Sequence, residues 1–149
     1  MPGAAGPANL VMGRVASDQV QGSNVTYTTL FSQAIGANEV WSFEAVLFFL
    51  TAAATTGIVT TLSGPASPAN VVITMETGES ATVWRTLPGA AFDAALVGTA
   101  GLTTVLVAKV KGTVENGTNA GTLALKFRSE VNGSNVTVKR GSFVRWMKH

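Results

Sequence analysis

Apolar and polar residues alternate along most of this chain with a period of two. The clearest case is the stretch "EVWSFEAVLFFL", residues 39–50. Every second residue there is apolar, namely Trp41, Phe43, Ala45, Leu47 and Phe49. Ser42 and Glu44 fall on the opposite face. Alternation at this period predicts a β-strand with one face in a core and the other in solvent.

Similar stretches predict further strands along the rest of the chain. They span residues 13–20, 24–31, 57–64, 70–76, 81–88, 102–116, 121–130, 135–141 and 142–147. The segment "GAAFDAALVGTAG", residues 89–101, breaks this series. Its alanine content permits a short helix, but because glycine bounds it on both sides we expect a long loop with one turn.

Turn signals separate the predicted strands at short intervals. Asn116-Gly117 predicts a tight hairpin between its flanking strands, and Asn132-Gly133 predicts the next turn. The segment GSNVT occurs twice, at Gly22–Thr26 and Gly133–Thr137, and is interpreted as a turn that leads into a strand. About eight to ten strands without a helical period indicate an all-β fold, an antiparallel β-sandwich of jelly-roll-like form.

The length of 149 residues is typical of one domain. We expect a single β-sandwich domain over residues 13–149. Residues 1–12 begin with the Pro-, Gly- and Ala-rich "MPGAAGPANL" and are expected to form a flexible N-terminal arm. This start is not typical of a secretory signal, because no basic region precedes an apolar core.

Charged residues make up only 12% of the chain and apolar residues 46%. So few charges indicate that part of the surface is covered by another molecule. The net charge is about −3 over residues 1–85 and about +5 over residues 86–149. The basic residues of the second part are spaced out along strands, which is typical of solvated strand faces. An acidic protein neighbour is the next alternative and nucleic acid the third.

Few residues offer catalytic or metal-binding chemistry. The chain has no cysteine, and its one histidine is the terminal His149. This excludes disulfides, thiolate metal sites and a His-based triad within one chain. The carboxylates Glu44, Glu76 and Glu79 show no spacing that singles out a pair. We therefore expect no catalytic residue, no metal site and no cofactor.

The most apolar segment, residues 40–62, is long enough to raise the question of a membrane span. Its alternation and Glu44 indicate two strands instead, so no membrane partner is expected. The last strand, "SFVRWM", carries apolar residues on both faces. Val144 and Trp146 share one face, and Phe143 and Arg145 lie on the other. Such a strand lies either inside a core or at a subunit contact.

Two stretches carry a resemblance to a known group of proteins. They are "SQAIGANEVWSFEAVLFF" at residues 32–49 and "LALKFRSEVNGSNVTVKRGSFVRW" at residues 123–146. Together they cover about forty residues and resemble small β-structured virion proteins of tailed bacteriophages, among them head decoration proteins, head fibres and tail modules. The resemblance implies a jelly-roll-like module, often a homotrimer, without enzymatic activity.

On this basis the expected function is that of a capsid decoration, or cement, protein. It would be made in the cytoplasm of a bacterial host and bind the outer capsid surface of the virion, where it bridges subunits of the major capsid protein. The residues expected at the capsid or subunit contact are Lys139, Arg140, Arg145 and Trp146. No nucleic-acid partner is expected. The alternative is a tail-tip or receptor-binding module that recognises a bacterial surface glycan through an exposed aromatic groove with Trp84 or Tyr27.

Overall fold

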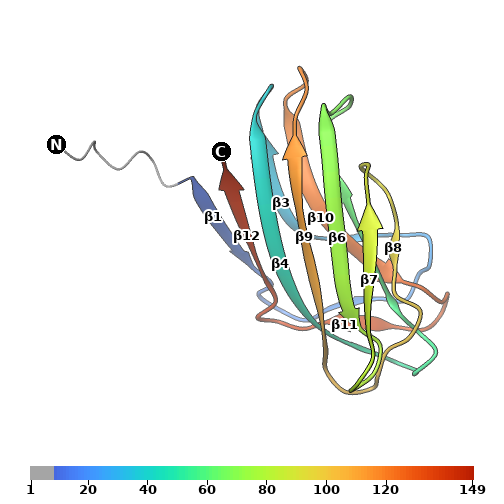
Figure 1. Ribbon diagram of the computed structural model, residues 1–149. Coiled ribbons are helices and arrows are strands. Elements are labelled where there is room, and N and C mark those ends of the chain that lie inside the picture. Colours follow the sequence, from blue (N-terminus) through green and yellow to red (C-terminus); the bar gives the residue numbers. More distant parts are fainter. Residues whose placement is uncertain (1–8) are drawn as a thin grey trace.

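The computed structural model describes residues 9–149, which form two antiparallel β-sheets and contain no helix (Figure 1). The strands are β1 (Leu10–Arg14), β2 (Gln19–Gln21), β3 (Thr28–Ile35), β4 (Val40–Thr51), β5 (Ile58–Ser63), β6 (Asn70–Gly78), β7 (Trp84–Gly89), β8 (Leu96–Val97), β9 (Leu106–Glu115), β10 (Gly121–Ser129), β11 (Val136–Val138) and β12 (Phe143–Lys148). The predicted all-β sandwich is confirmed.

The two sheets differ in size. The larger sheet has the strand order β1-β12-β4-β9-β6-β7, and β11 pairs with both β4 and β2 beside this path. The smaller sheet has the order β3-β10-β5-β8. Figure 1 shows β3 and β10 behind β4 and β9, so the smaller sheet backs the centre of the larger one. The opposite face of the larger sheet, called the outer face below, is not covered by any described element.

The core forms between the sheets from the residues that the alternation predicts. The five apolar residues of β4 named above are at most 6% exposed, and Leu123, Leu125 and Phe127 of β10 are 0% exposed. Ser42 and Glu44 lie on the outer face, as expected from the period of two. Burial of these large side chains is the main favourable contribution to folding.

The segment of residues 89–101 runs along the smaller sheet instead of forming a helix. Leu96 and Val97 make the short strand β8 beside β5. The backbone N of Asp93 donates to the carbonyl of Leu62, and the Thr61 hydroxyl donates to the carbonyl of Ala94. The segment therefore covers β5, whose residues are almost all buried. The predicted turn is present at residues 92–93, but the prediction of a loop missed the short strand β8.

The hairpin predicted at Asn116-Gly117 is wrong. The flanking strands β9 and β10 belong to different sheets and do not pair. The Asn116 side chain donates to the carbonyls of Gly36 and Asn119, at 2.7 and 2.8 Å, and its backbone N donates to the Glu39 carbonyl. These bonds tie the connection to the β3–β4 turn and direct the chain across the end of the sandwich.

The turn at Asn132-Gly133 is present, with Gly133 at a φ of 78°. It also connects the two sheets, because β10 lies in the smaller sheet and β11 in the larger. The left-handed backbone conformation at this position favours glycine.

The two GSNVT segments lie against each other. The backbone N of Gly133 donates to the carbonyl of Gly22 at 2.8 Å, and β11 pairs with β2. The second copy leads into β11 at Val136, as predicted. The first copy does not begin a strand, since it lies in the connection between β2 and β3. There the Ser23 hydroxyl accepts hydrogen bonds from the backbone N of Val25 and Thr26.

The expected N-terminal arm overlaps the first strand. Its residues 1–8 lie outside the described part of the chain. Its last three residues, Leu10–Met12, belong to β1 and pair with β12. These three residues are all apolar, show no alternation with polar residues and follow a Pro- and Gly-rich stretch, so the sequence pattern alone does not separate them from the arm.

Candidate functional site

The predicted contact residues fall into three different environments. Lys139 and Arg140 lie in the turn that leads from β11 to β12, beside Asp18. Arg145 lies on β12 and faces outward, with its guanidinium 5.6 Å from the centre of the Phe143 ring. The structure therefore brings Lys139 and Arg140 together and leaves Arg145 on the outer face of the larger sheet.

Trp146 belongs to the core. It is 1% exposed, and its ring centre lies 5.1 Å from that of Phe43. The sequence did not decide whether this strand lies in the core or at a subunit contact. The structure places its residues Val144 and Trp146 in the core. The expectation that the Trp146 ring lies at a contact surface does not agree with this burial.

The basic turn is held by one acidic residue. Asp18 forms an ion pair with Lys139 and accepts a hydrogen bond from the backbone N of Arg140 at 2.8 Å. The hydrogen bond from Lys139, followed by that from Arg140, lowers the pKa of Asp18 below its usual range. The Arg140 side chain is exposed, so this turn presents a positive group to solvent.

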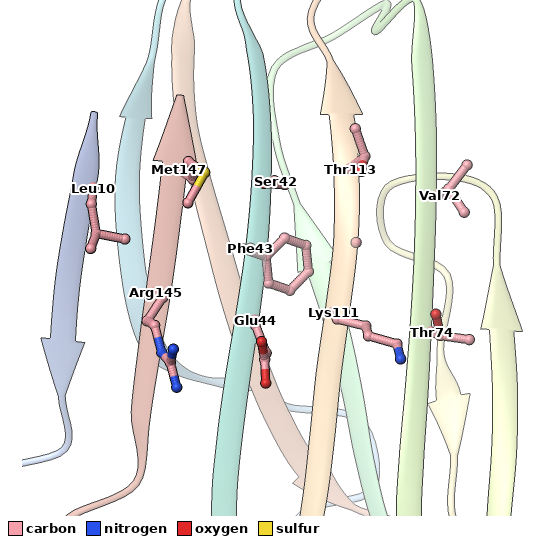
Figure 2. A pocket seen from close by; sticks show the side chains of 11 residues that line it. Leu10, Ser42, Phe43, Glu44, Val72, Thr74, Lys111, Thr113, Arg145 and Met147 are labelled. Carbon is pink, nitrogen blue, oxygen red and sulfur yellow. The ribbon is translucent and has the colours of Figure 1, made fainter. Parts of the chain in front are cut away.

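A second surface lies on the outer face of the larger sheet, where Figure 2 shows a shallow depression seen from close by. Its volume is about 460 Å³. It crosses five strands and is lined by Leu10, Ser42, Phe43, Glu44, Val72, Thr74, Lys111, Gly112, Thr113, Arg145 and Met147. The small residues Ser42, Gly112 and Thr113 at its centre account for the hollow.

The side chains around this depression form two rows across the strands (Figure 2). One row is mostly apolar, with Leu10, Met147 and Val72 exposed by 44, 46 and 51%. The next row is charged and alternates in sign across β12, β4 and β9, with Arg145 opposite Glu44 and Glu44 opposite Lys111. Lys111 also lies 3.6 Å from Glu76 of β6. Exposed apolar side chains gathered on one face of a sheet mark a candidate contact surface.

The β3–β4 turn and the end of β12 meet at a carboxylate that the sequence analysis missed. Glu39 pairs with Lys148 and accepts hydrogen bonds from the Trp41 Nε1 and the backbone N of Gly36, at 2.9 and 2.8 Å. The hydrogen bond from Lys148, followed by those from Trp41 and Gly36, lowers the pKa of Glu39 to about 2. The arrangement ties β12 to β4 and has a structural role.

The aromatic residues considered for a glycan groove do not lie together. Trp84 is 56% exposed on β7, at the edge of the larger sheet. Tyr27 is half-buried before β3, with the Arg128 guanidinium 5.1 Å from its ring centre. The structure thus offers one exposed aromatic ring instead of a groove of two.

Two further depressions are smaller or more polar. One, of about 440 Å³, lies between residues 64–71 and residues 90–93. The other, of about 240 Å³, opens between the edge strands β1 and β3 above Trp146. Among residues 9–149 no group of three His, Asp or Glu side chains is arranged to hold a metal ion. In the same part of the chain, no helix has the length and apolar character needed to cross a bilayer.

Comparison with known proteins gives low similarity. No protein family model matches the chain, and no curated protein matches it. Among solved structures, the VP2 subviral particle of infectious bursal disease virus aligns with a TM-score of 0.27 and 14% identity, covering 93% of this chain and 39% of that one. T=1 particles derived from the same virus align with a TM-score of 0.26 and 14% identity, over 93% and 39% of the two chains.

The chain therefore spans about two fifths of the length of these viral proteins. A similarity at this level supports no transfer of function or assembly to this chain. The resemblance to virion proteins of tailed bacteriophages remains a prediction from the sequence.

Proposed function

We propose that this chain is a non-enzymatic structural protein of a virion that decorates the capsid and bridges subunits of the major capsid protein. The observation that carries this proposal is the outer face of the larger sheet. It exposes apolar side chains and an alternating row of charges over several strands, and no described element covers it. Such a surface fits association with other proteins better than turnover of a small substrate.

The basic turn supplies the contact with the capsid. Lys139 and Arg140 present positive charge on a turn that Asp18 holds in place. An acidic patch on the capsid surface would complement them. Each contact of this kind is weak, because exposed ion pairs contribute little free energy. A decoration protein gains its effect from many equivalent sites acting on one shell.

The localisation on the virion and the lack of a cofactor are part of the same proposal. The homotrimer implied by the sequence resemblance stays a prediction. Nucleic acid is not a partner in this proposal, since the basic residues are spread over strands and one turn.

The proposal is tested by binding the purified chain to capsids that lack it, followed by co-sedimentation. The double variant Lys139→Ala/Arg140→Ala should bind more weakly, and its binding should depend less on salt concentration. Lys126→Ala, which removes a charge from the smaller sheet, is the matched control and should bind like the wild type. Failure of the wild-type chain to bind any capsid preparation, with density for it only at the tail of the virion, would refute the decoration role.

The exposed Trp84 favours one second candidate, a receptor-binding module for a bacterial surface glycan. An exposed aromatic ring can stack on the apolar face of a sugar. Glycan-array binding by the isolated chain, lost in Trp84→Ala and kept in Trp84→Tyr, would support it. An array without signal, together with capsid binding, would leave the decoration role as the better assignment.

A further inference from the structure

We propose that two copies of this chain pair face to face through the outer faces of β1, β12, β4 and β9. The pair is related by a two-fold axis that runs parallel to the strands. The axis lies in front of the outer face, level with the gap between β12 and β4. The contact is isologous, since each copy uses the same surface. This inference does not rest on the proposed capsid role. It gives the outer face to a second copy of the chain, so in the pair the contact with the capsid falls to the basic turn of Lys139 and Arg140. It also replaces the homotrimer implied by the sequence resemblance with a pair.

The registers of the larger sheet define three rows on this face. The first row is Leu10, Met147, Ser42 and Thr113, on β1, β12, β4 and β9 in that order. The second row, in the same order, is Met12, Arg145, Glu44 and Lys111. The third row is Arg14, Phe143, Val46 and Lys109. Figure 2 shows most of the first two rows, lying across the strands at two levels.

A rotation of 180° about the proposed axis keeps each residue at its level along the strands. It places β12 of one copy over β4 of the other, and β1 over β9. Arg145 then faces Glu44 of the second copy, and Glu44 faces Arg145 of the second copy. Within residues 9–149 of one chain, neither of these side chains belongs to an ion pair. The two-fold symmetry therefore creates two ion pairs between groups that are free to form them.

The same rotation fills the depression. Met147 lies over Ser42 of the second copy, and Leu10 lies over Thr113 of the second copy. The larger side chains of one copy thus enter the hollow left by the small residues of the other. Methionine is suited to this role, because its flexible chain fills irregular gaps. In the third row Phe143 lies over Val46 of the second copy, which adds a further apolar contact.

One contact of the pair is unfavourable. Arg14 lies at the level of Lys109 of the second copy, and the two positive charges repel each other. This pair is at the margin of the contact, where both side chains reach solvent and the repulsion is screened. Replacing Lys109 by an acidic residue should therefore strengthen the pairing, which is an unusual result for a charge reversal.

A different axis, between β4 and β9, fits less well. It would place Glu44 opposite Lys111 of the second copy, but Lys111 already lies 3.6 Å from Glu76 of its own chain. It would also set Ser42 opposite Thr113, so that the two hollows face each other and enclose an empty space. Empty space at an interface forfeits dispersion contacts. The geometry therefore selects the axis between β12 and β4.

The test measures the mass of the purified chain by sedimentation equilibrium over a range of concentrations. The wild type should approach the mass of two chains. Glu44→Arg and Arg145→Glu should each raise the dissociation constant at least tenfold, since each sets two like charges face to face. The double variant Glu44→Arg/Arg145→Glu should recover pairing, because the swapped charges meet again across the axis.

Further variants keep the test informative if a charge reversal lowers stability. Met147→Ser changes an exposed residue and should weaken pairing while the melting temperature of the monomer stays unchanged. Lys109→Glu should strengthen pairing. Lys126→Glu, the same charge change on the smaller sheet, should have no effect. A monomer at all concentrations, a mass of three chains, or a double variant that pairs no better than either single variant would each overturn the proposal.

Discussion

Replacement of Trp146 by alanine tests whether this residue belongs to the core or to a contact surface. Trp146 is 1% exposed and packs against Phe43, with ring centres 5.1 Å apart at an interplanar angle of 37°. Truncation of a buried tryptophan to alanine leaves a cavity and costs about 3–5 kcal/mol of stability. In a domain of this size each kcal/mol lowers the melting temperature by about 2–4 °C. The expected decrease is therefore about 6–20 °C.

Trp84 provides a matched control in the same chain. It is 56% exposed, so Trp84→Ala removes the same side chain with little change in buried area. Substitutions at such surface positions usually change stability by about 0.5 kcal/mol or less. Thermal and urea unfolding of both variants should be compared at one protein concentration, because self-association raises the melting temperature. The urea midpoint should decrease for Trp146→Ala with an unchanged slope.

Equal stability of the two variants would refute the assignment of Trp146 to the core. If Trp146→Ala were also folded normally but bound capsids more weakly, the contact role expected from the sequence would be restored. The intermediate variant Trp146→Phe separates size from aromatic packing. It should lose less stability than alanine, because a ring remains beside Phe43.

Three further predictions concern the ends of the sandwich. The lowered pKa of Glu39 means that its ionised form stabilises the fold above about pH 4.5, the ordinary pKa of the group, and that this contribution is lost as the pH falls toward 2. The stability of Glu39→Gln, measured by urea unfolding, should therefore depend less on pH in this window than that of the wild type. An unchanged pH profile would contradict the role of its bonds. Gly57→Ala should be strongly destabilising, because a Cβ there would lie 1.8 Å from the carbonyl O of Gly98. Gly78→Ala should lose little stability, because its Cβ would have its nearest contact at 3.5 Å. Equal melting temperatures of the two variants would contradict this packing. Asn116→Asp loses the two donors that its amide presents to carbonyl groups and should cost about 1–3 kcal/mol or more, measured by chemical denaturation; a stability within error of the wild type would show that these bonds are dispensable.

The sequence predicted the strands well where one face of a strand is clearly apolar and the other carries polar residues. In β4 polar residues alternate with apolar ones only as far as Glu44, but every second residue from Trp41 to Phe49 is apolar and buried, because this face meets the smaller sheet. The same holds for Leu123, Leu125 and Phe127 of β10. Alternation is a local property, so it can be found without knowledge of the partner strands.

Connections between sheets were not predictable in the same way. Asn116-Gly117 has the residues of a tight hairpin, yet it joins β9 of one sheet to β10 of the other. A turn signal indicates that the chain reverses, but a reversal within a sheet and a reversal across a sandwich use the same residue types. Here the Asn116 side chain donates to the carbonyl of Gly36 and its backbone N donates to the carbonyl of Glu39, both in the β3–β4 turn and distant in sequence. Long-range bonds of this kind decide the connection.

The candidate site shows the same division between local and long-range information. The sequence places Glu44 opposite the apolar face of its strand. It places Arg145 on one face of the last strand, about a hundred residues away, and does not decide which face of that strand is inside. Only the pairing of β12 with β4 makes them neighbours, and only the pairing of β4 with β9 adds Lys111 to the row. A period of two fixes the face of each side chain and leaves its level along the sheet open.

The level along the sheet is what gives the outer face its complementarity. If β12 were shifted by two residues against β4, Arg145 would keep its outward direction but would lie beside Ser42 or Val46 instead of Glu44. The apolar row and the charged row would then no longer be separate, and Met147 would not stand at the level of the small residues that form the hollow. The bonds of Glu39 with Lys148 and Trp41 help hold this register, since they fix the end of β12 to the start of β4. A carboxylate that lies outside the contact surface thus determines which side chains meet on it.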